Sequence, residues 1–317
     1  MRAVVYDRYG PPSVLRLEEV SVPVPGPEQV LVEVAATSIN LSDWECLRGS
    51  PLYARIGGLR TPKRRTLGSD IAGRVVAVGE AVTRFAVDDE VYGDNLELMG
   101  GFAEYTLAPQ AVLAHKPEGL SFEQASTLPQ AGAIALQGTA GIADGQRVLI
   151  NGAGGGSGAF AIQLAKAAGA HVTGIDNAGK LAFMRSVGAD EVGDYRSEDF
   201  ADFAPFDHIL DLVATRSPFA CRRALAPGGR YRCVGGPVRR LLPIVTVGAV
   251  LGRATGRRVG MLAVKQGPTA FEALADRCLA GDVTIHIDRT FGLHEVPDAL
   301  TYVGEGRAHG KVVIKPD

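Results

Sequence analysis

A cluster of glycines between residues 152 and 158 carries the clearest chemical signal in this chain. It follows an apolar segment, Arg147 to Asn151, and leads into a segment of helical character, Ser157 to Ala168. A second apolar segment, His171 to Asp176, comes next. Glycines allow a tight turn and close approach of the backbone to a ligand, and free N–H groups at a helix N-terminus attract anions. This order of segments therefore predicts a βαβ unit that binds a dinucleotide through its diphosphate.

The glycine turn departs slightly from the usual dinucleotide pattern. It reads Ala153-x-Gly155-x-x-Gly158, with alanine in place of the first glycine. We expect Gly158 to let the helix pack closely on the first strand. The residues expected to contact the diphosphate are Gly154, Gly155, Gly156 and Ser157.

Two charged residues near the end of the second strand bear on the form of the cofactor. Asp176 lies about 20 residues beyond the glycines, where an acidic side chain accepts hydrogen bonds from the ribose hydroxyls of NAD. It could instead cap the following helical segment, Ala178 to Val187. Lys180 would suit the 2′-phosphate of NADP, or it could be a solvated lysine on the first turn. The sequence therefore predicts NAD(P)H without a preference between the two forms.

The elements that must position these residues predict a two-domain α/β protein. The first 115 residues hold short strand-like segments punctuated by Pro and Gly, which predicts a partly open β-barrel. From Ser121, which forms a capping-box pattern with Gln124, strand and helix segments alternate. This alternation predicts a Rossmann doubly wound parallel sheet of about six strands. We expect a dinucleotide-binding domain at residues 124–265, and one catalytic domain formed by residues 1–123 and 266–317.

Individual strands follow from the apolar segments. Those predicted for the barrel are Arg2–Tyr6, Leu15–Val20, Gln29–Thr37, Ile71–Val78, Glu90–Tyr92 and Phe102–Leu107. Those predicted for the parallel sheet are Val148–Asn151, His171–Asp176, Glu191–Asp194, His208–Leu212, Arg230–Val234 and Val259–Val264.

Composition limits the classes of partner. The chain has 317 residues, 46% of them hydrophobic and 21% charged, with a formal net charge of −2, so neither nucleic acid nor an anionic membrane is expected as a partner. Its four cysteines are scattered and form no Cys-x-x-Cys, which argues against a disulfide framework and favours a cytoplasmic protein. The longest apolar run, Leu241 to Leu251, is too short to span a membrane. It could line a substrate pocket, form an interface helix or belong to the core.

Several motifs spread over the chain resemble the medium-chain dehydrogenase/reductase superfamily, most closely its zinc-free quinone oxidoreductase branch. The motifs are Asn40–Asp43, Leu67–Val76, Gly101–Tyr105, Gly145–Lys166 and Gly310–Ile314. The resemblance implies that the first domain is a GroES-like barrel and that the protein is a homodimer. Zinc members of the superfamily hold a catalytic metal at positions that correspond here to Asn40, Gly68-Ser69-Asp70 and Gln130. Zinc prefers thiolate and imidazole ligands, so no zinc is expected.

The resemblance also implies further contacts with the cofactor. Lys180 and Tyr195 match positions that contact the 2′-phosphate, whereas Asp176 stands where this branch often has a small residue. We also expect Val213 and Gly235, which follow the next two long strands of the sheet, to contact the cofactor.

Asn40 and Tyr53 are the candidate catalytic residues. Asn40 would hold the carboxamide of the nicotinamide or the substrate oxygen, or it could satisfy loop backbone. Tyr53 would donate a proton or orient the substrate, or it could be a half-exposed barrel residue. Asp43 is expected to tie down the loop rather than act as a base.

These residues predict hydride transfer from NAD(P)H to a quinone or an α,β-unsaturated carbonyl without a metal. Two alternatives remain open. One is an alcohol or ketone dehydrogenase acting in secondary metabolism. The other is an NAD(P)H-binding protein with little turnover.

Overall fold

The computed structural model describes residues 1–56 and 58–316, with side chains described except at 249–255. The described chain divides into two compact units. Unit 1 comprises Met1–Ala133, Gln266–Gly281 and Ile285–Asp317, and unit 2 comprises Ile134–Lys265 and Asp282–Thr284. The C-terminal segments therefore fold with the N-terminal residues.

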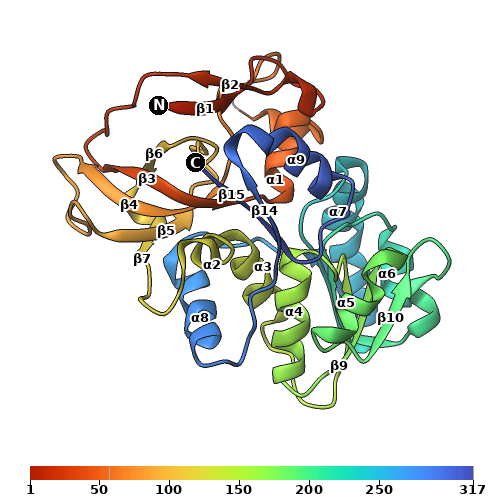
Figure 1. Cartoon of the computed structure of the whole chain (residues 1–317). Coiled ribbons are helices and arrows are strands. Elements are labelled where there is room, and N and C mark those ends of the chain that lie inside the picture. The colour runs from red at the N-terminus through yellow and green to blue at the C-terminus, as the bar shows by residue number, and fades with distance from the viewer. Residues whose placement is uncertain (57, 317) are drawn as a thin grey trace. The chain divides into compact units, whose positions relative to one another are not determined.

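Unit 1 is built on a seven-stranded sheet in which strands from both ends of the chain are neighbours (Figure 1). Its path runs β14 (Ile287–Gly292), β15 (Lys311–Lys315), β3 (Gln29–Ser38), β4 (Asp70–Val78), β5 (Glu90–Asp94) and β7 (Leu113–His115), with β6 (Tyr105–Pro109) paired to β3. A two-stranded sheet is formed by β1 (Arg2–Val5) and β2 (Arg16–Glu19). The prediction of a GroES-like β domain is confirmed.

Helices and apolar side chains complete unit 1. One core cluster includes Leu47 on α1 (Leu41–Arg48), Leu300 on α9 (Val296–Gly304) and Ile314 on β15. A second lies between β3, β4 and β5 and includes Val32 and Ile71. The remaining helices are α2 (Phe122–Ser126) and α8 (Pro268–Leu279). The predicted capping box of α2 is confirmed, because the Ser121 hydroxyl accepts from Gln124 N and the Gln124 side chain accepts from Ser121 N.

The bounds predicted for the strand Phe102–Leu107 are wrong, because the structure has β6 at Tyr105–Pro109. Phe102 N donates to Leu67 O, and Ala103 forms an isolated bridge with Ala3. These residues thus pair with other segments before β6 begins at Tyr105.

Unit 2 is a six-stranded parallel sheet, as predicted. The strand order is β10 (Glu191–Asp194), β9 (His171–Asp176), β8 (Arg147–Asn151), β11 (Phe206–Asp211), β12 (Leu225–Cys233) and β13 (Arg258–Met261). Its helices include α4 (Gly156–Ala167), α5 (Leu181–Ser186), α6 (Pro218–Arg223) and α7 (Val238–Thr255), while α3 (Pro129–Thr139) spans the boundary of the two units. Val148, Leu149 and Ile150 of β8 are all fully buried, as expected for a central parallel strand covered on both faces.

The apolar run Leu241 to Leu251 lies within α7. Ile244 is fully buried, whereas Leu242 and Val245 are exposed. A Cβ on Gly248 would lie 2.7 Å from Val259 O, so this glycine lets α7 pack closely on β13. In the part of the run whose side chains the structure describes, one face of α7 is therefore packed in the core and the other face is exposed. Among the described residues, no helix is long and apolar enough to cross a membrane.

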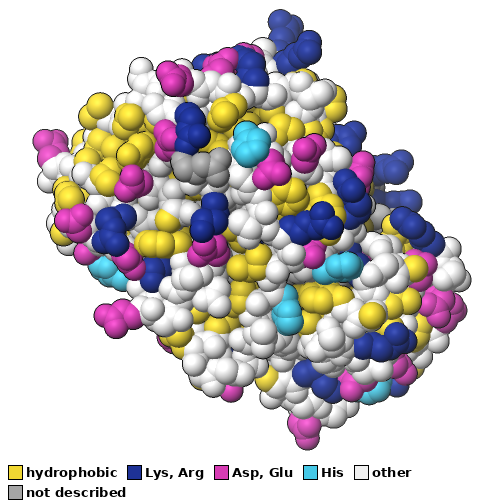
Figure 2. All heavy atoms as spheres, viewed as in Figure 1, with side chains coloured by type: hydrophobic (Ala, Val, Ile, Leu, Met, Phe, Trp, Pro, Cys, Tyr) yellow, Lys and Arg dark blue, Asp and Glu magenta, His cyan; other side chains and the backbone are white. Residues whose placement is uncertain are grey.

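Charged side chains of both signs are interspersed with hydrophobic ones on much of the face shown in Figure 2. Scattered apolar side chains are normal on folded proteins and by themselves indicate no partner.

Candidate active site

The glycine turn of unit 2 joins β8 to α4. Gly152 has φ of +82°, which favours glycine, and a Cβ on Gly158 would lie only 2.4 Å from Gly152 O. Gly158 therefore allows the helix to start this close to the turn. A Cβ on Gly155 would meet Gly152 O at 3.6 Å, an ordinary van der Waals contact. Because the first N–H groups of a helix lack intrahelical acceptors, the start of α4 at Gly156 and Ser157 fits an anionic diphosphate.

This turn lies where the strand order of the sheet reverses. From β8 the chain continues outward to β9 and β10 on one side, then returns to β11 on the other. In parallel sheets such a switch point opens a crevice at the carboxyl ends of the strands. Val213 follows β11 and lies beside the turn, where a Cβ on Gly152 would be 3.1 Å from its side chain. Gly235, with φ of +68°, follows β12 at the same edge.

Asp176 and Lys180 form a buried pair at the end of β9. Asp176 Oδ2 accepts from Gly154 N at 3.0 Å, and its Oδ1 lies 3.5 Å from Lys180 Nζ. The prediction that Lys180 could be solvated is wrong: its side chain is 6% exposed and packs against Gly154, where a Cβ would clash with it. Tyr195 is half-exposed, and its N donates to Asp176 O. The structure thus brings Gly154, Asp176, Lys180 and Tyr195 together.

Asp211, a residue that the sequence did not single out, fixes the neighbouring loop. Its Oδ1 accepts from Asn151 Nδ2 at 2.8 Å and from Val213 N at 3.0 Å, and its Oδ2 accepts from the Tyr231 hydroxyl at 2.7 Å. Burial is the main cause that raises the pKa of Tyr231, and the charge of Asp211 raises it further. Asp211 therefore links β8 and β12 to Val213, the residue of this loop that is expected to contact the cofactor.

In unit 1, Asn40 lies between β3 and α1 and is 8% exposed. Its Oδ1 accepts from Lys311 Nζ at 2.7 Å, and its Nδ2 donates to Ser69 Oγ at 3.1 Å. Asp43 accepts from Asn40 N at 2.8 Å and from Gly68 N at 3.0 Å, so this carboxyl ties two loops together. Burial raises the pKa of Asp43 to about 7.

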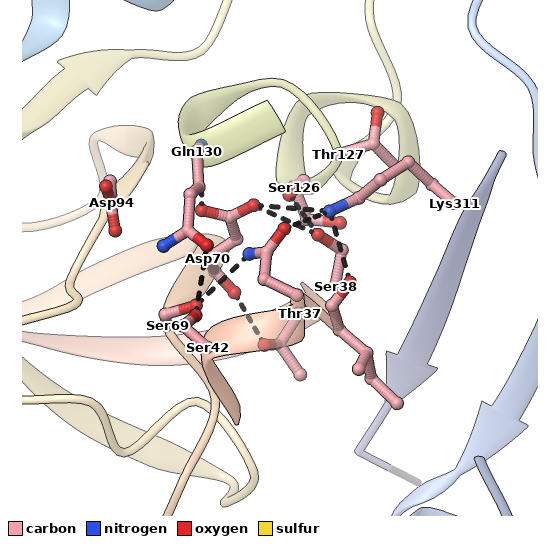
Figure 3. Close-up of polar contacts among 12 residues, drawn as sticks. Thr37, Ser38, Ser42, Ser69, Asp70, Asp94, Ser126, Thr127, Gln130 and Lys311 are labelled. Carbon is pink, nitrogen blue, oxygen red and sulfur yellow. Dashed lines mark hydrogen bonds and ion pairs between the residues drawn. The ribbon is translucent and has the colours of Figure 1, made fainter. Parts of the chain in front are cut away.

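Asp70 and Gln130 complete the same cluster (Figure 3). Gln130 N donates to Asp70 Oδ1 at 3.1 Å, and Ser42 Oγ donates to Gln130 Oε1 at 3.0 Å. The residues at the positions of the superfamily's zinc ligands thus do come together. They offer amides, a hydroxyl and a carboxylate, and Asn40 Oδ1 already faces an ammonium, so this donor set does not fit a catalytic zinc. In the described chain, no group of three or more His, Cys, Asp or Glu residues could hold a metal ion.

Lys311 and Asp94 belong to this cluster but were not predicted as site residues. Lys311 Nζ lies 3.5 Å from Asp70 Oδ2, and burial lowers its pKa while the carboxylates oppose that shift. Burial raises the pKa of Asp70, and the charge of Lys311 offsets part of the effect. Asp94 has a pKa raised to about 8, first by burial and then by the charge of Asp70. The only sequence signal for Lys311 is the Gly310–Ile314 motif.

Tyr53 lies in a 3-10 helix (Leu52–Arg55) and contacts a second carboxyl group that was not predicted. Its hydroxyl lies 3.1 Å from both carboxyl oxygens of Glu45 on α1. Burial raises the pKa of Glu45 to about 7, and the hydrogen bond from Tyr53 opposes this shift. A tyrosine beside such a carboxyl can donate and recover a proton near neutral pH.

Comparison with known proteins agrees with this arrangement. Residues 26–118 match the family model "Alcohol dehydrogenase GroES-like domain", and residues 187–314 match "Zinc-binding dehydrogenase". The chain is 34% identical to 2-methylene-furan-3-one reductase of Solanum lycopersicum, covering 100% of this chain and 79% of the relative. It is 33% identical to the mitochondrial NAD(P)H oxidoreductase RTN4IP1 of Homo sapiens, covering 99% and 89%.

A solved quinone oxidoreductase from Coxiella burnetii has the same fold. It superposes with a TM-score of 0.89 at 30% identity and covers 100% of this chain and 99% of the other. The chain therefore belongs to the medium-chain dehydrogenase/reductase superfamily, in its quinone-oxidoreductase-like branch.

Proposed function

We propose that this protein is a metal-free, NAD(P)H-dependent reductase that transfers hydride to a quinone or an α,β-unsaturated carbonyl. The observation that carries the proposal is the 2.7 Å contact between Lys311 Nζ and Asn40 Oδ1, which places an ammonium where a zinc enzyme needs free metal ligands. Without a Lewis acid, a carbon that is already electrophilic is the most suitable hydride acceptor. The relatives named as a furanone reductase and a quinone oxidoreductase act on such acceptors, which supports this class.

Unit 2 is assigned to the cofactor. When bound, NAD(P)H supplies two electrons and one hydrogen nucleus as hydride. We assign the diphosphate to the turn at Gly154, Gly155, Gly156 and Ser157, and the adenosine ribose to the edge formed by Asp176, Lys180 and Tyr195. Val213 and Gly235 would contact the cofactor on the far side of the switch point. We assign no preference for NADH or NADPH to the wild-type pair.

Unit 1 is assigned to the acceptor. Asn40, held by Lys311 and Ser69, would bind the carboxamide of the cofactor or the oxygen of the acceptor. For an enone, hydride adds to the β-carbon and the C=C electron pair moves toward the carbonyl oxygen. The Tyr53 hydroxyl would then give a proton to the α-carbon of the resulting enolate, and the carbonyl double bond re-forms to complete the saturated ketone. The Glu45 carboxyl returns a proton to Tyr53, and solvent reprotonates Glu45.

The test is oxidation of NADH and NADPH by a panel of 1,4-quinones, enones, ketones and alcohols, with and without a chelator. We expect quinone or enone reduction that the chelator does not change. Alcohol oxidation abolished by the chelator would instead indicate a metal-dependent dehydrogenase. Stoichiometric NAD(P)H binding without reduction of any acceptor would indicate a binding protein.

We also propose that the protein is a cytoplasmic homodimer. β13 is an edge strand of the parallel sheet, and exposed Leu242 and Val245 lie on the helix packed beside it, which supports pairing with a second copy. All four cysteines are unpaired, as is usual in a reducing compartment. Light scattering would report the oligomeric state, and a monomer at micromolar concentration would contradict the dimer.

A further inference from the structure

Lys311 is an unusual side chain for the interior of a sheet. It lies in β15 between β14 and β3, and its side chain is only 4% exposed. Its ammonium contacts Asn40 Oδ1 at 2.7 Å, Ile39 O at 3.3 Å and Asp70 Oδ2 at 3.5 Å. A buried charge is costly unless it is paired and hydrogen-bonded. These three oxygen atoms together offset the cost of burying the ammonium.

We infer that Lys311 is a positioning residue for Asn40 and supplies the fixed positive charge of the buried cluster. This inference rests on the proposed function, in which Asn40 contacts the cofactor or the acceptor. Lys311 itself is not assigned a contact with either.

The chemistry of the ammonium sets the orientation of the Asn40 amide. An ammonium has three donors and no acceptor, so only Oδ1 of Asn40 can face it. The Nδ2 group is thereby directed to Ser69 Oγ at 3.1 Å, and the Ser69 hydroxyl in turn points to Asp43 Oδ2 at 3.5 Å. Each hydrogen bond of this series is therefore donated in the same direction, from Lys311 to Asn40, from Asn40 to Ser69 and from Ser69 to Asp43. A neutral side chain in place of Lys311 would allow the amide to rotate.

The same ammonium is the cationic neighbour of Asp70, at 3.5 Å from its Oδ2. Asp70 is fully buried, accepts from Gln130 N at 3.1 Å and lies 3.2 Å from Ser38 Oγ. The Ser38 hydroxyl hydrogen has a closer acceptor in Ser126 O, at 2.8 Å. Asp43 and Asp94 lie close enough for their charges to act on Lys311 and on one another. Without the ammonium, the fully buried Asp70 carboxyl would lose its cationic neighbour, and an unpaired buried charge is strongly destabilising.

The fold delivers Lys311 to this place through backbone pairing at the end of β3. Ile39 N donates to Val312 O at 3.0 Å, and Val313 pairs with Ser38. Just before the lysine, Gly310 has φ of +82°, and a Cβ there would lie 2.6 Å from His286 O. The glycine and lysine of this motif therefore have distinct roles, one in backbone conformation and one in charge.

The first test compares Lys311→Met with Lys315→Met. Lys315 lies on the same strand but is exposed and pairs with Glu123 at the surface. We expect K311M to lower kcat by about 10- to 100-fold, because loss of alignment at a reacting centre costs about this much. We expect K315M to keep the wild-type kcat. In a double-mutant cycle, K311M with Asn40→Ala should be no slower than N40A alone within about twofold, since Lys311 acts through Asn40. Losses that multiply would overturn the inference.

A second variant covers the case in which K311M does not fold. Asp70→Asn with Lys311→Met removes both charges, and replacing a buried ion pair by neutral groups often preserves stability. We expect this double variant to fold and still reduce the acceptor about 10-fold or more slowly than wild type. A folded double variant with wild-type kcat would show that Lys311 is only structural.

A readout without turnover separates this inference from the proposed function. The Asn40 side-chain NH₂ resonances of ¹⁵N-labelled protein should shift or broaden in K311M and stay unchanged in K315M. If the wild type reduces no quinone or enone, the proposed function fails, but this measurement still decides whether Lys311 orients Asn40. Unchanged resonances in folded K311M would overturn the positioning role.

Discussion

The two units each contain a buried lysine–aspartate pair with an Nζ–O distance of 3.5 Å, yet the pairs differ in how they are assembled. In unit 2, Asp176 ends β9, and Lys180 lies four residues further on in the 3-10 helix Ala178–Lys180. In unit 1, Asp70 and Lys311 come from β4 and β15, distant in sequence, and Asp70 is fully buried. The first pair follows from local chain geometry, whereas the second exists only when the whole sheet has formed. Although the Nζ–O distances are the same, we expect the two pairs to contribute differently to the free energy of unfolding.

The largest expected difference between the pairs is in stability. Asp70→Ala leaves the Lys311 ammonium buried without its carboxylate and removes the acceptor for Gln130 N, so it should lower the free energy of unfolding by about 3–5 kcal/mol. Asp176→Ala leaves Gly154 N without its acceptor and Lys180 without its carboxylate, but the Asp176 side chain is 11% exposed where that of Asp70 is fully buried, so the loss should be smaller, about 1–3 kcal/mol. Urea denaturation of both variants measures the difference. Equal losses would show that the sheet does not isolate Asp70 from solvent more than the turn isolates Asp176.

Glu45 extends the comparison to a partly buried carboxyl group that contacts a neutral tyrosine hydroxyl. Tyr53→Phe should lower kcat for enone reduction by about 100-fold, because it removes the proposed proton donor. With the pKa of Glu45 near 7, the wild-type rate should fall as pH rises above about 7, since ionised Glu45 cannot return a proton. Glu45→Gln should abolish this limb of the pH profile.

The surface pair of Tyr105 and Glu33, with an oxygen–oxygen distance of 3.1 Å, offers a matched control. Tyr105→Phe should leave kcat and its pH profile unchanged. A Tyr53→Phe variant as active as Tyr105→Phe would remove Tyr53 from the mechanism.

The contrast between the two pairs also explains what the sequence could predict. The glycine turn, the strand ending at Asp176 and the six-stranded sheet depend on residues close together in the chain, and the sheet was predicted correctly. The meeting of Asn40, Asp70 and Gln130 was anticipated only through the family resemblance. The roles of Lys311 and Asp211 could not be read from local pattern, because their partners lie up to 272 residues away. The burial of Lys180 was missed because it depends on how the side chain packs against Gly154.

The effect of pH on stability tests the buried cluster of unit 1 more finely. The pKa of Asp94 is raised to about 8 in the folded protein from an unfolded value near 4, so the folded state holds one more proton than the unfolded state between these pH values. The contribution of Asp94 is therefore fully present below about pH 4 and is lost as pH rises through about 8, at about 1.4 kcal/mol per pH unit. Asp94→Asn should flatten this dependence, because asparagine stays neutral and can still accept from Leu96 N.

The measurement is the free energy of unfolding from pH 5 to pH 9 for the wild type and the variant. Asp276→Asn, at an exposed position on α8, serves as the control and should follow the wild type. Parallel curves for D94N and wild type would mean that Asp94 is ionised throughout and that the cluster is better solvated than its burial indicates.

The smallest expected effect concerns cofactor preference at the unit 2 pair. Asp176→Ser removes a negative charge and frees the Lys180 ammonium, so it should raise the ratio of kcat/KM for NADPH to that for NADH by about tenfold, equivalent to about 1.4 kcal/mol. Lys180→Met should move the ratio in the opposite direction, because the carboxylate of Asp176 then stands without its cation. If both variants keep the wild-type ratio, the pair serves only to hold Gly154 and the turn in place, as the 3.0 Å bond from Gly154 N allows. The unit 2 pair would then resemble the unit 1 pair in function as well as in distance, with each lysine acting on a neighbouring residue and not on a ligand.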